Sequence, residues 1–352
     1  MTVVGSSLLP AMALLLVAMQ LSCNKDAPPQ PPLVPPDTTS HSFQWQLDTL
    51  GDGASSILRD VAIVNDTLVY AVGELYKHDS LGGWDPIPYN LARWNGTKWQ
   101  MIRVNFYIFC GQPQTTPCPT QGLLAFSPTD IWITSNNSQV ARWDGLTERD
   151  IFCVPGSTGE MWGTDSTSLY VVDGNGQVCF WNGQTWARLV SRTSANINDI
   201  WGVVEPNGQR TILLAASNRY SAGEKKLLSL NASGSVDSLA WSPGTKLNTV
   251  WFASKDKLFV GGDGAYSGTP SSWTGIAVLA SAFTTRIRGT AQNDVVAVGA
   301  FGSCSHFNGD TWKTYPEVSL PGGSYEGLAV TKSFVVAVGF AGDRAVALRG
   351  RR

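Results

Sequence analysis

Acidic side chains stand at the starts of short apolar segments, where paired carboxyl groups could act as general acid and base. Glu160 opens the segment Glu160-Met-Trp-Gly163, and Glu326 precedes a comparable segment. Hydrolysis of a glycosidic bond needs two carboxyl groups roughly 5–10 Å apart across that bond. Glu160 and Glu326 are therefore the candidate catalytic residues, with Asp60, Asp130 or Asp199 as further carboxylates for such a pair. Aspartates beside short strands also cap turns, so a structural role stays open.

Aromatic rings occur together with Asp, Arg and His side chains in two long segments, 74–89 and 104–121, and in several shorter loops. Rings stack on the apolar faces of sugars, and planar polar groups bind hydroxyls, so this composition suits a glycan ligand. The candidate ligand-binding residues are Tyr76, His78, Trp84, Arg219, Tyr220, Asp263, Tyr266, Arg286, Arg288, Phe301 and Phe340. The alternative is that these side chains pack loops or cap a channel.

Cysteines and histidines suggest a disulfide and no metal site. Cys110 and Cys118 lie in one proline-bearing segment, where a local disulfide would stiffen the loop. Cys153 and Cys179 either pair with each other or remain free thiols, and Cys304 is expected to be buried. The three histidines of the chain lie at no ligand spacing, so no metal site is predicted. Neither a glycine-rich phosphate loop nor a Gly-x-Ser-x-Gly elbow occurs, and no cofactor is expected.

These residues lie within an internal repeat. A short aliphatic strand pattern that ends in a small residue recurs seven times, about every 40 residues after the first copy. The copies are 68–73, 131–135, 169–173, 213–217, 258–262, 295–299 and 335–339.

A second pattern follows the first. Phe180-Trp-Asn-Gly183 with Trp186 and His306-Phe-Asn-Gly309 with Trp312 share one spacing, as does the copy that ends at Gly96 with Trp99. Asn-Gly between apolar segments predicts a hairpin turn, because both central positions favour positive φ. Each unit therefore contains four strands, A to D, and a 40-residue unit of four strands is typical of a β-propeller blade.

The two ends of the repeat region complement each other. The seventh unit has no strand D of its own, and residues 43–49 match the strand D of the first unit. We expect this N-terminal strand to close the last blade, so that no sheet edge stays unpaired. The fold class predicted for 43–352 is all-β, a seven-bladed β-propeller of four-stranded blades.

The two long segments extend a loop between strands B and C and a connection between strand D and the next strand A. Both kinds of loop open on the same face of a propeller, so we expect one elaborated face, called here the inserted-loop face. Loop-borne function concentrates on such a face. The starts of strand A place Arg59, Glu160, Arg286, Arg288 and Glu326 near the central channel.

Residues 1–22 indicate export. An apolar run from Leu8 to Leu21 is shorter than the roughly 20 residues of a membrane-spanning helix, and it ends before Cys23. This segment resembles a bacterial lipoprotein signal, which implies lipidation at Cys23 and placement at the outer membrane or cell surface. An ordinary secretory signal is the alternative. Residues 23–42 contain six prolines in nine positions, a composition that favours an extended linker.

Composition excludes several classes of protein. The net charge of −2 over 352 residues argues against a nucleic-acid partner. Only 15% of residues are charged and 43% are hydrophobic, which argues against disorder.

The units resemble bacterial propeller repeats that read roughly Asp-Val-Trp-Ala-Val-Gly and then Trp-Asn-Gly-x-x-Trp, and the resemblance covers about 43–352. Propellers serve both as binding modules and as enzymes, so the resemblance implies the fold and not the function. Sialidase repeats carry an Asp two residues before the turn Gly, where this chain has Trp94, Trp181 and Phe307.

The sequence thus predicts an exported, lipid-anchored, monomeric propeller that binds a glycan, a peptide or an envelope protein through the inserted-loop face. The first alternative is a carbohydrate-active enzyme that uses carboxylates at the channel mouth. The second alternative is a structural subunit of an envelope complex.

Overall fold

Tight turns divide the chain into short antiparallel strands. The computed structural model describes residues 37–352 apart from 219, 221, 232 and 233. Gly96, Gly145, Gly183 and Gly309 have φ between 89° and 105°, a region that favours glycine. The Asn or Asp before each of these glycines accepts hydrogen bonds from the two backbone N–H groups that follow the glycine, and these bonds hold the turn.

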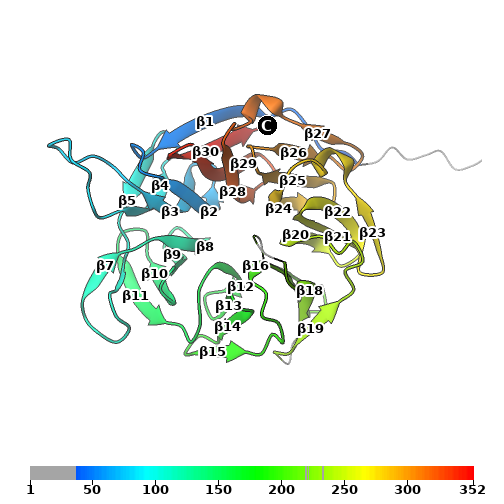
Figure 1. Ribbon diagram of the computed structural model, residues 1–352, viewed down its shortest axis with the longest axis horizontal. Coiled ribbons are helices and arrows are strands. Elements are labelled where there is room, and N and C mark those ends of the chain that lie inside the picture. Colours follow the sequence, from blue (N-terminus) through cyan, green and yellow to red (C-terminus); the bar gives the residue numbers. More distant parts are fainter. Residues whose placement is uncertain (1–36, 219, 221, 232–233) are drawn as a thin grey trace, which may run out of the picture. The chain divides into compact units, whose positions relative to one another are not determined.

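The strands form seven four-stranded antiparallel sheets, arranged as blades around a channel (Figure 1). Blades 1 to 3 contain β2 (Ile57–Asn65), β3 (Leu68–Leu75), β4 (Tyr89–Trp94), β5 (Trp99–Ile102); β8 (Thr120–Ser127), β9 (Asp130–Ser135), β10 (Gln139–Trp143), β11 (Glu148–Cys153); and β12 (Glu160–Asp165), β13 (Ser168–Asp173), β14 (Gln177–Trp181), β15 (Trp186–Leu189). A short hairpin, β6 (Asn105–Tyr107) and β7 (Thr115–Pro117), lies between blades 1 and 2.

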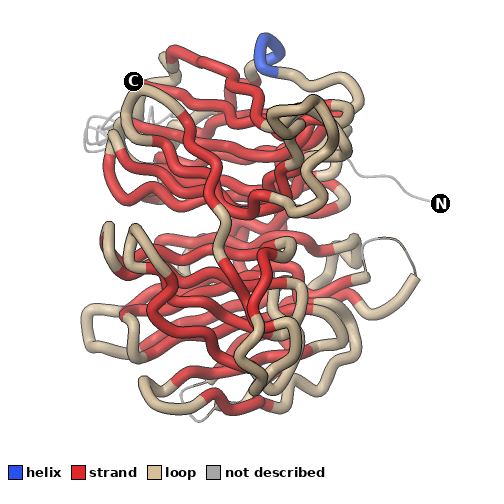
Figure 2. The backbone as a smooth tube through the Cα atoms, turned by 90° about the vertical axis from the view of Figure 1, so that its left-hand side faces the viewer, coloured by secondary structure: helices blue, strands red, loops and turns tan. Residues whose placement is uncertain are grey.

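Blades 4 to 6 contain β16 (Ile197–Val204), β17 (Arg210–Ser217), β18 (Lys225–Leu230), β19 (Val236–Leu239); β20 (Leu247–Ser254), β21 (Lys257–Gly262), β22 (Gly264–Thr269), β23 (Ser272–Gly275); and β24 (Thr284–Ala291), β25 (Asp294–Gly299), β26 (Cys304–Phe307), β27 (Trp312–Thr314). Short 3-10 turns, η1 (Ala277–Leu279) and η2 (Pro316–Val318), precede blades 6 and 7. Edge-on, the strands cross the thickness of the ring, and the loops gather at its two faces (Figure 2).

The seventh blade is built from both ends of the described chain. Its order is β1 (Gln44–Leu50), β30 (Arg344–Arg351), β29 (Phe334–Ala341) and β28 (Gly323–Val330). β1 pairs with β30 from Gln44 with Arg351 to Leu50 with Ala345. The predicted propeller, its seven blades and the closing N-terminal strand are therefore confirmed.

Each blade buries both faces of its sheet against its neighbours. One apolar cluster joins Val72 and Leu91 of blade 1 to Ile133 of blade 2, and another joins Leu58 of blade 1 to Val336 of blade 7. Because both sheet faces are covered, strands in the middle of a sheet, such as β3, β13 and β25, are almost continuously apolar instead of alternating. The core therefore lies between blades, and each blade depends on the next.

Polar contacts reinforce the closing strand. The guanidinium of Arg349, on β30, donates two hydrogen bonds to Asp48 of β1, at 2.6 and 3.2 Å. Trp99 of blade 1 donates to the same carboxylate at 2.9 Å, and Arg349 lies 3.7 Å above the ring of Trp94. Asp48 thus joins the closing strand, the last blade and the first blade.

No helix of the described residues is long and apolar enough to cross a membrane. The leader and most of the linker, 1–36, with Cys23, lie outside the described residues.

Deletion of 43–49 should abolish the cooperative unfolding transition, because blade 7 then has an unpaired edge and Trp99 of blade 1 loses its contact with Asp48. Asp48→Ala should lower the free energy of unfolding by about 2–3 kcal/mol, because it leaves the buried Arg349 without its anion. Asp256→Ala, in an exposed turn, should change it by less than about 0.5 kcal/mol. Urea denaturation followed by tryptophan fluorescence measures all three, and an unchanged transition in the truncated chain would contradict the closure.

Candidate functional site

The innermost strands carry irregularities near their starts. In blades 1, 4, 5, 6 and 7 one residue of the innermost strand has no partner on the next strand, and blade 2 has a similar register shift between Thr120 and Leu123. A β-bulge of this kind re-aims a side chain, here toward the channel mouth in every case except Thr285, which is buried. The residues at these shifts are Arg59, Gln121, Asn198, Asn248, Thr285 and Glu326.

Aspartates beside two bulges satisfy the free inner edges of the sheets. Asp60 accepts hydrogen bonds from the N–H of Val61 and from the N–H of Leu123 in the next blade, both at 2.9 Å. Asp199 likewise accepts from Ile200 and from Val250 of the next blade, both at 3.0 Å. These carboxylates join neighbouring blades through backbone groups that would otherwise lack partners.

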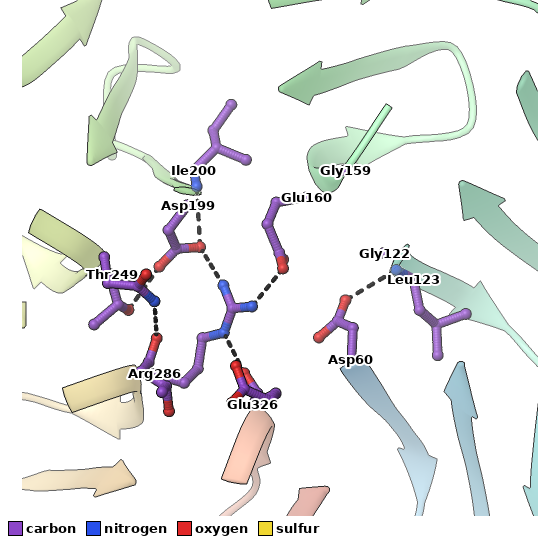
Figure 3. A network of polar contacts seen from close by, with 12 residues as sticks. Asp60, Gly122, Leu123, Gly159, Glu160, Asp199, Ile200, Thr249, Arg286 and Glu326 are labelled. Atoms are coloured by element: carbon purple, nitrogen blue, oxygen red, sulfur yellow. Dashed lines mark hydrogen bonds and ion pairs between the residues drawn. The ribbon is translucent and has the colours of Figure 1, made fainter. Parts of the chain in front are cut away.

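Two arginines of blade 6 reach into the channel. Arg286 donates to Asp199 at 3.0 Å, to the backbone oxygen of Glu326 at 3.3 Å, and to Glu160 (Figure 3). Arg288 donates twice to Asp199, at 2.8 and 2.9 Å. In Figure 3 the Arg286 guanidinium lies between Asp199 and Glu160, whereas Asp60 lies beyond it and points to Leu123. The cluster therefore ties blades 3, 4, 6 and 7 together across the channel.

The carboxyl groups of this cluster differ in ionisation. Burial raises the pKa of Glu160 to about 8; the Asp60 and Asp199 carboxylates add to this rise, and Arg286 opposes it. Burial also raises the pKa of Asp60. The pKa of Asp199 lies below its ordinary value in spite of burial, because Arg288 and Arg286 both bind it. Burial thus favours the protonated form of Glu160, and Asp199 is the anion for both arginines.

A cavity of ≈180 Å³ opens above this cluster at the mouth of the channel. Its lining is mostly polar: Arg59, Gln121, Gly159, Glu160, Asp173, Asn196, Ile197, Asn198, Asn248, Arg286 and Glu326. Several of these side chains already have partners, since Arg59 pairs with Glu74 at 3.0 Å and Asn198 donates to the carbonyls of Ser217 and Leu247. The cavity offers amide and carboxyl groups to a polar ligand group.

The structure brings both catalytic candidates, Glu160 and Glu326, to this mouth, together with Asp60 and Asp199 below it. In the structure Glu160 binds Arg286, and Asp60 and Asp199 bind the strand edges of the neighbouring blades. Asp130 lies on the opposite face of the ring. It is the first residue of β9, directly after the turn between strands A and B of blade 2, and it binds Arg142 at 2.8 Å.

The first inserted segment, between β3 and β4, is pinned at its base and packs on itself. Arg103 binds Asp85 and the carbonyl of Ile87, and lies 4.2 Å above the ring of Tyr89. Within the loop, the rings of His78 and Trp84 stack with centroids 3.9 Å apart. Tyr76 donates to Glu74 at 3.2 Å. The loop is therefore ordered, although its tip residue Leu81 is 93% exposed.

The second inserted segment forms the β6–β7 hairpin, and its disulfide differs from the predicted one. Cys110, near the tip, is bonded to Cys153 at the end of β11, with Cα atoms 5.8 Å apart. Cys118 is a buried free thiol in the core between blades 1 and 2, where burial raises its pKa to about 11. The pairing with Cys118 was wrong because that side chain points inward, whereas the fold brings the outer strand of blade 2 to the hairpin tip.

The remaining cysteines are free. Cys179 is a buried thiol, so it does not pair with Cys153, and Cys304 is buried as expected. The Cys110–Cys153 bond closes 43 residues, and chain entropy alone gives such a bond roughly 4 kcal/mol of stabilisation. The bond fixes the neighbouring Phe109, which is 72% exposed.

The other predicted ligand-binding residues separate into three groups. Tyr220 and Phe301 project from the β17–β18 and β25–β26 loops and are 91% and 67% exposed, and Asp263 is the exposed turn between β21 and β22. Tyr266 belongs to β22 and packs on Trp241, with ring centroids 5.4 Å apart, and Phe340 lies within β29, so neither is a loop residue. Arg219 lies outside the described residues.

Exposed apolar side chains concentrate on the inserted-loop face. Twelve large apolar side chains are exposed in the described residues, and nine of them lie in B–C loops or D–A connections: Leu81, Trp84, Ile87, Ile108, Phe109, Val190, Tyr220, Val278 and Phe301. Leu146 and Val204 lie in turns of the opposite face, and Leu47 lies on the closing strand. The two inserted segments extend outward from blades 1 and 2, at the left of the ring in Figure 1.

Sequence reasoning missed the amides at the mouth, including Asn198 and Asn248. Both occupy the bulge position that Arg59 and Glu326 occupy in blades 1 and 7. An alignment of the strand A starts could have found them. Asn198 directly precedes Asp199, as Arg59 precedes Asp60, and Asn248 holds the same position before Thr249.

Comparisons with known proteins support the architecture. No family model matches the chain, and no curated protein matches its sequence. A solved structure described as YCF48 bound to D1 peptide is 14% identical, covers 92% of this chain and 99% of its own, and has a TM-score of 0.64. The WD40 β-propeller domain of Doa1 is 12% identical, with coverages of 86% and 96% and a TM-score of 0.59. YCF48 from Cyanidioschyzon merolae is 13% identical, with coverages of 86% and 98% and a TM-score of 0.58. At these identities the likeness shows the fold alone.

Glu160→Gln should change how stability depends on pH. A carboxyl group whose pKa is raised to about 8 in the folded chain stabilises it most below its ordinary value of 4.5, and this contribution is lost as the pH rises through 8. The glutamine keeps an oxygen for Arg286 and does not ionise. We therefore expect the stability of the variant relative to the native chain to rise between pH 5 and pH 9.

Urea denaturation across this pH range measures the effect. Glu317→Gln, an exposed position, should follow the native curve. Parallel native and Glu160→Gln curves would contradict the placement of the proton.

Proposed function

We propose that this protein is an exported, lipid-anchored propeller that binds a protein partner through its inserted-loop face. The partner presents an extended peptide segment that contacts the inserted segments and reaches the polar channel mouth. The observation that carries the proposal is the concentration of exposed apolar side chains on this face.

The chemistry of these side chains favours a peptide over a glycan. Sugars bind to flat rings and planar polar groups, whereas Leu81, Ile108 and Val278 offer only aliphatic surface. His78 and Trp84 already stack on each other, and Tyr266 packs on Trp241, so these rings are partly used within the fold. Exposed aliphatic and aromatic side chains around a polar centre suit peptide side chains and a peptide backbone.

The order in the loops supports binding without large rearrangement. The Cys110–Cys153 bond fixes the hairpin, and Arg103 fixes the base of the β3–β4 loop. A surface that is ordered before binding loses less conformational entropy when a partner docks. The YCF48 structure that resembles this chain is described as bound to a peptide, which is support by analogy of fold.

Export and anchoring are the second part of the proposal. The apolar run before Cys23 and the proline-rich segment after it support cleavage before Cys23, lipidation of its thiol and a tether of about 3.1 Å per residue. The propeller then works at an envelope surface, where protein partners are at hand.

A photoreactive benzoylphenylalanine at position 109 should form a covalent adduct with a protein in the cells that produce the chain. The same residue at position 146, which is 79% exposed on the opposite face, is the matched control and should not form that adduct. With the captured partner in hand, Phe109→Ser should weaken binding about tenfold or more, and Leu146→Ser should leave it unchanged. An adduct from both positions, or only with glycan, would contradict the proposal.

Cys23→Ser should move the chain from the membrane fraction to the soluble fraction, because the acyl chains have no other attachment site in this proposal. Cell fractionation and the mass of the N-terminal peptide measure the change. A native chain that is cleaved but carries no lipid would contradict the anchor and leave the binding proposal untouched.

A further inference from the structure

Residues 37–42 form an extended strap on the face opposite the inserted loops. The strap crosses blade 6 between its A–B turn and its C–D turn, immediately before the closing strand β1. Thr39 donates from its N–H to the carbonyl of Asn308 at 3.0 Å and from its hydroxyl to the carbonyl of Asn293 at 2.8 Å. Asn293 donates back to the carbonyl of Asp37 at 2.9 Å. The strap has no regular strand partner, so isolated backbone and side-chain hydrogen bonds hold it, including those from Tyr315 to the carbonyl of His41 at 2.8 Å and from Arg352 to the carbonyl of Ser40 at 3.3 Å.

The central contact of the strap is a pair of histidines. Nδ1 of His41 lies 2.8 Å from Nδ1 of His306, a side chain of β26 that is fully buried. Nε2 of His306 lies 2.9 Å from the carboxylate of Asp294, and Nε2 of His41 lies 3.2 Å from the hydroxyl of Thr311. Asp294 can only accept, so Nε2 of His306 carries a proton.

The geometry allows this pair one positive charge at most. A hydrogen bond between the two Nδ1 atoms needs one proton between them, because one nitrogen must donate and the other accept. If both rings are protonated, two N–H groups meet at 2.8 Å and two positive charges face each other. The pair can therefore bind a second proton only if the ring of His41 moves away from the ring of His306.

The surroundings oppose a second charge as well. The ionisable groups that bind the pair or act on its charge are Asp294 of β25, Lys313 of β27, Tyr315 and Arg352, and Asp37 and Lys332 line the same pocket as Asp294 and Arg352. Asp294 is the anion in contact with the pair, and it already binds both His306 and Arg352, with a longer contact of 3.4 Å between Arg352 and Nε2 of His306. Hydrogen bonds from His306, Arg352 and Thr290 hold the pKa of Asp294 at about 2 in spite of its burial. Burial, His306 and Lys313 lower the pKa of His41.

We propose that residues 37–42 are an acid-released strap, in which a second proton on the His41–His306 pair detaches the strap from blade 6 while the propeller stays folded. Release adds six residues of free chain, at most about 20 Å, between the propeller and the segment before residue 37. It also removes the contacts that support the first residues of β1. This switch is independent of the proposed binding face, because it lies at the other end of the blades.

The direction and size of the pH dependence follow from linkage. The released His41 has its ordinary pKa of 6.5, and the docked one has a lower pKa, so docking is fully stable above 6.5 and weakens as the pH falls toward the lowered value. Each released strap takes up one proton more than a docked strap. The opening constant should therefore increase by up to about tenfold per pH unit in this window.

Hydrogen exchange of the Thr39 amide in the full chain, corrected for the intrinsic rate at each pH, measures the opening. Between pH 8 and pH 5 we expect the protection of this amide to fall by up to about tenfold per pH unit below pH 6.5. The amides of β25 and β29 should keep their protection. His41→Asn keeps an N–H donor at the Nδ1 position and does not ionise, so its protection should be independent of pH. His78→Asn, the third histidine and on the other face, is the matched control and should behave as the native chain.

NMR spectra of the three histidine rings give a second readout that does not depend on any variant. We expect the His41 signals to shift together with the loss of Thr39 protection. A native chain without pH dependence, or a His41→Asn chain with the native dependence, would overturn the proposal.

Discussion

The structure depends on the closure of the ring by β1 on β30. A single blade has two apolar sheet faces and an exposed inner edge, and it can bury them only between two neighbours. The cluster that joins Leu58 of blade 1 to Val336 of blade 7 exists only because the chain returns to its own start. Asp48, which binds Arg349 and Trp99, adds specific polar contacts at this joint. The ring then provides a rigid frame for loops on its two faces.

Closure also explains the chemistry of the channel. Seven inner edges meet there, and each presents backbone groups that have no partner strand on that side. Asp60 and Asp199 bind such groups of the neighbouring blade, and Arg286 and Arg288 offset the negative charge that this requires. The carboxylates of Asp60 and Asp199 thus hold the blades together, and burial beside them raises the pKa of Glu160. The surface that we propose for the partner lies above, in the bulged amides and the inserted loops.

The repeat made the fold predictable from the sequence. The Asn-Gly turns and the period of about 40 residues fix strand number and blade number, and the match of 43–49 to the first strand D predicts the closure. The site was less predictable. A disulfide between Cys110 and Cys153 depends on which outer strand ends beside the hairpin, and nearness in sequence favoured Cys118 instead. Likewise, the partner of His41 is 265 residues away, and no local pattern announces it.

One measurement tests the central functional claim most directly: a hydrogen-exchange footprint of the full chain bound to its partner. The account predicts new protection in 74–89 and 104–121 and at the starts of the inner strands, with the C–D turns around Leu146 and Asn308 unchanged. Protection confined to the C–D turns or to the closing strand β1 would contradict it and would place the interaction on the other face or on the side of the ring.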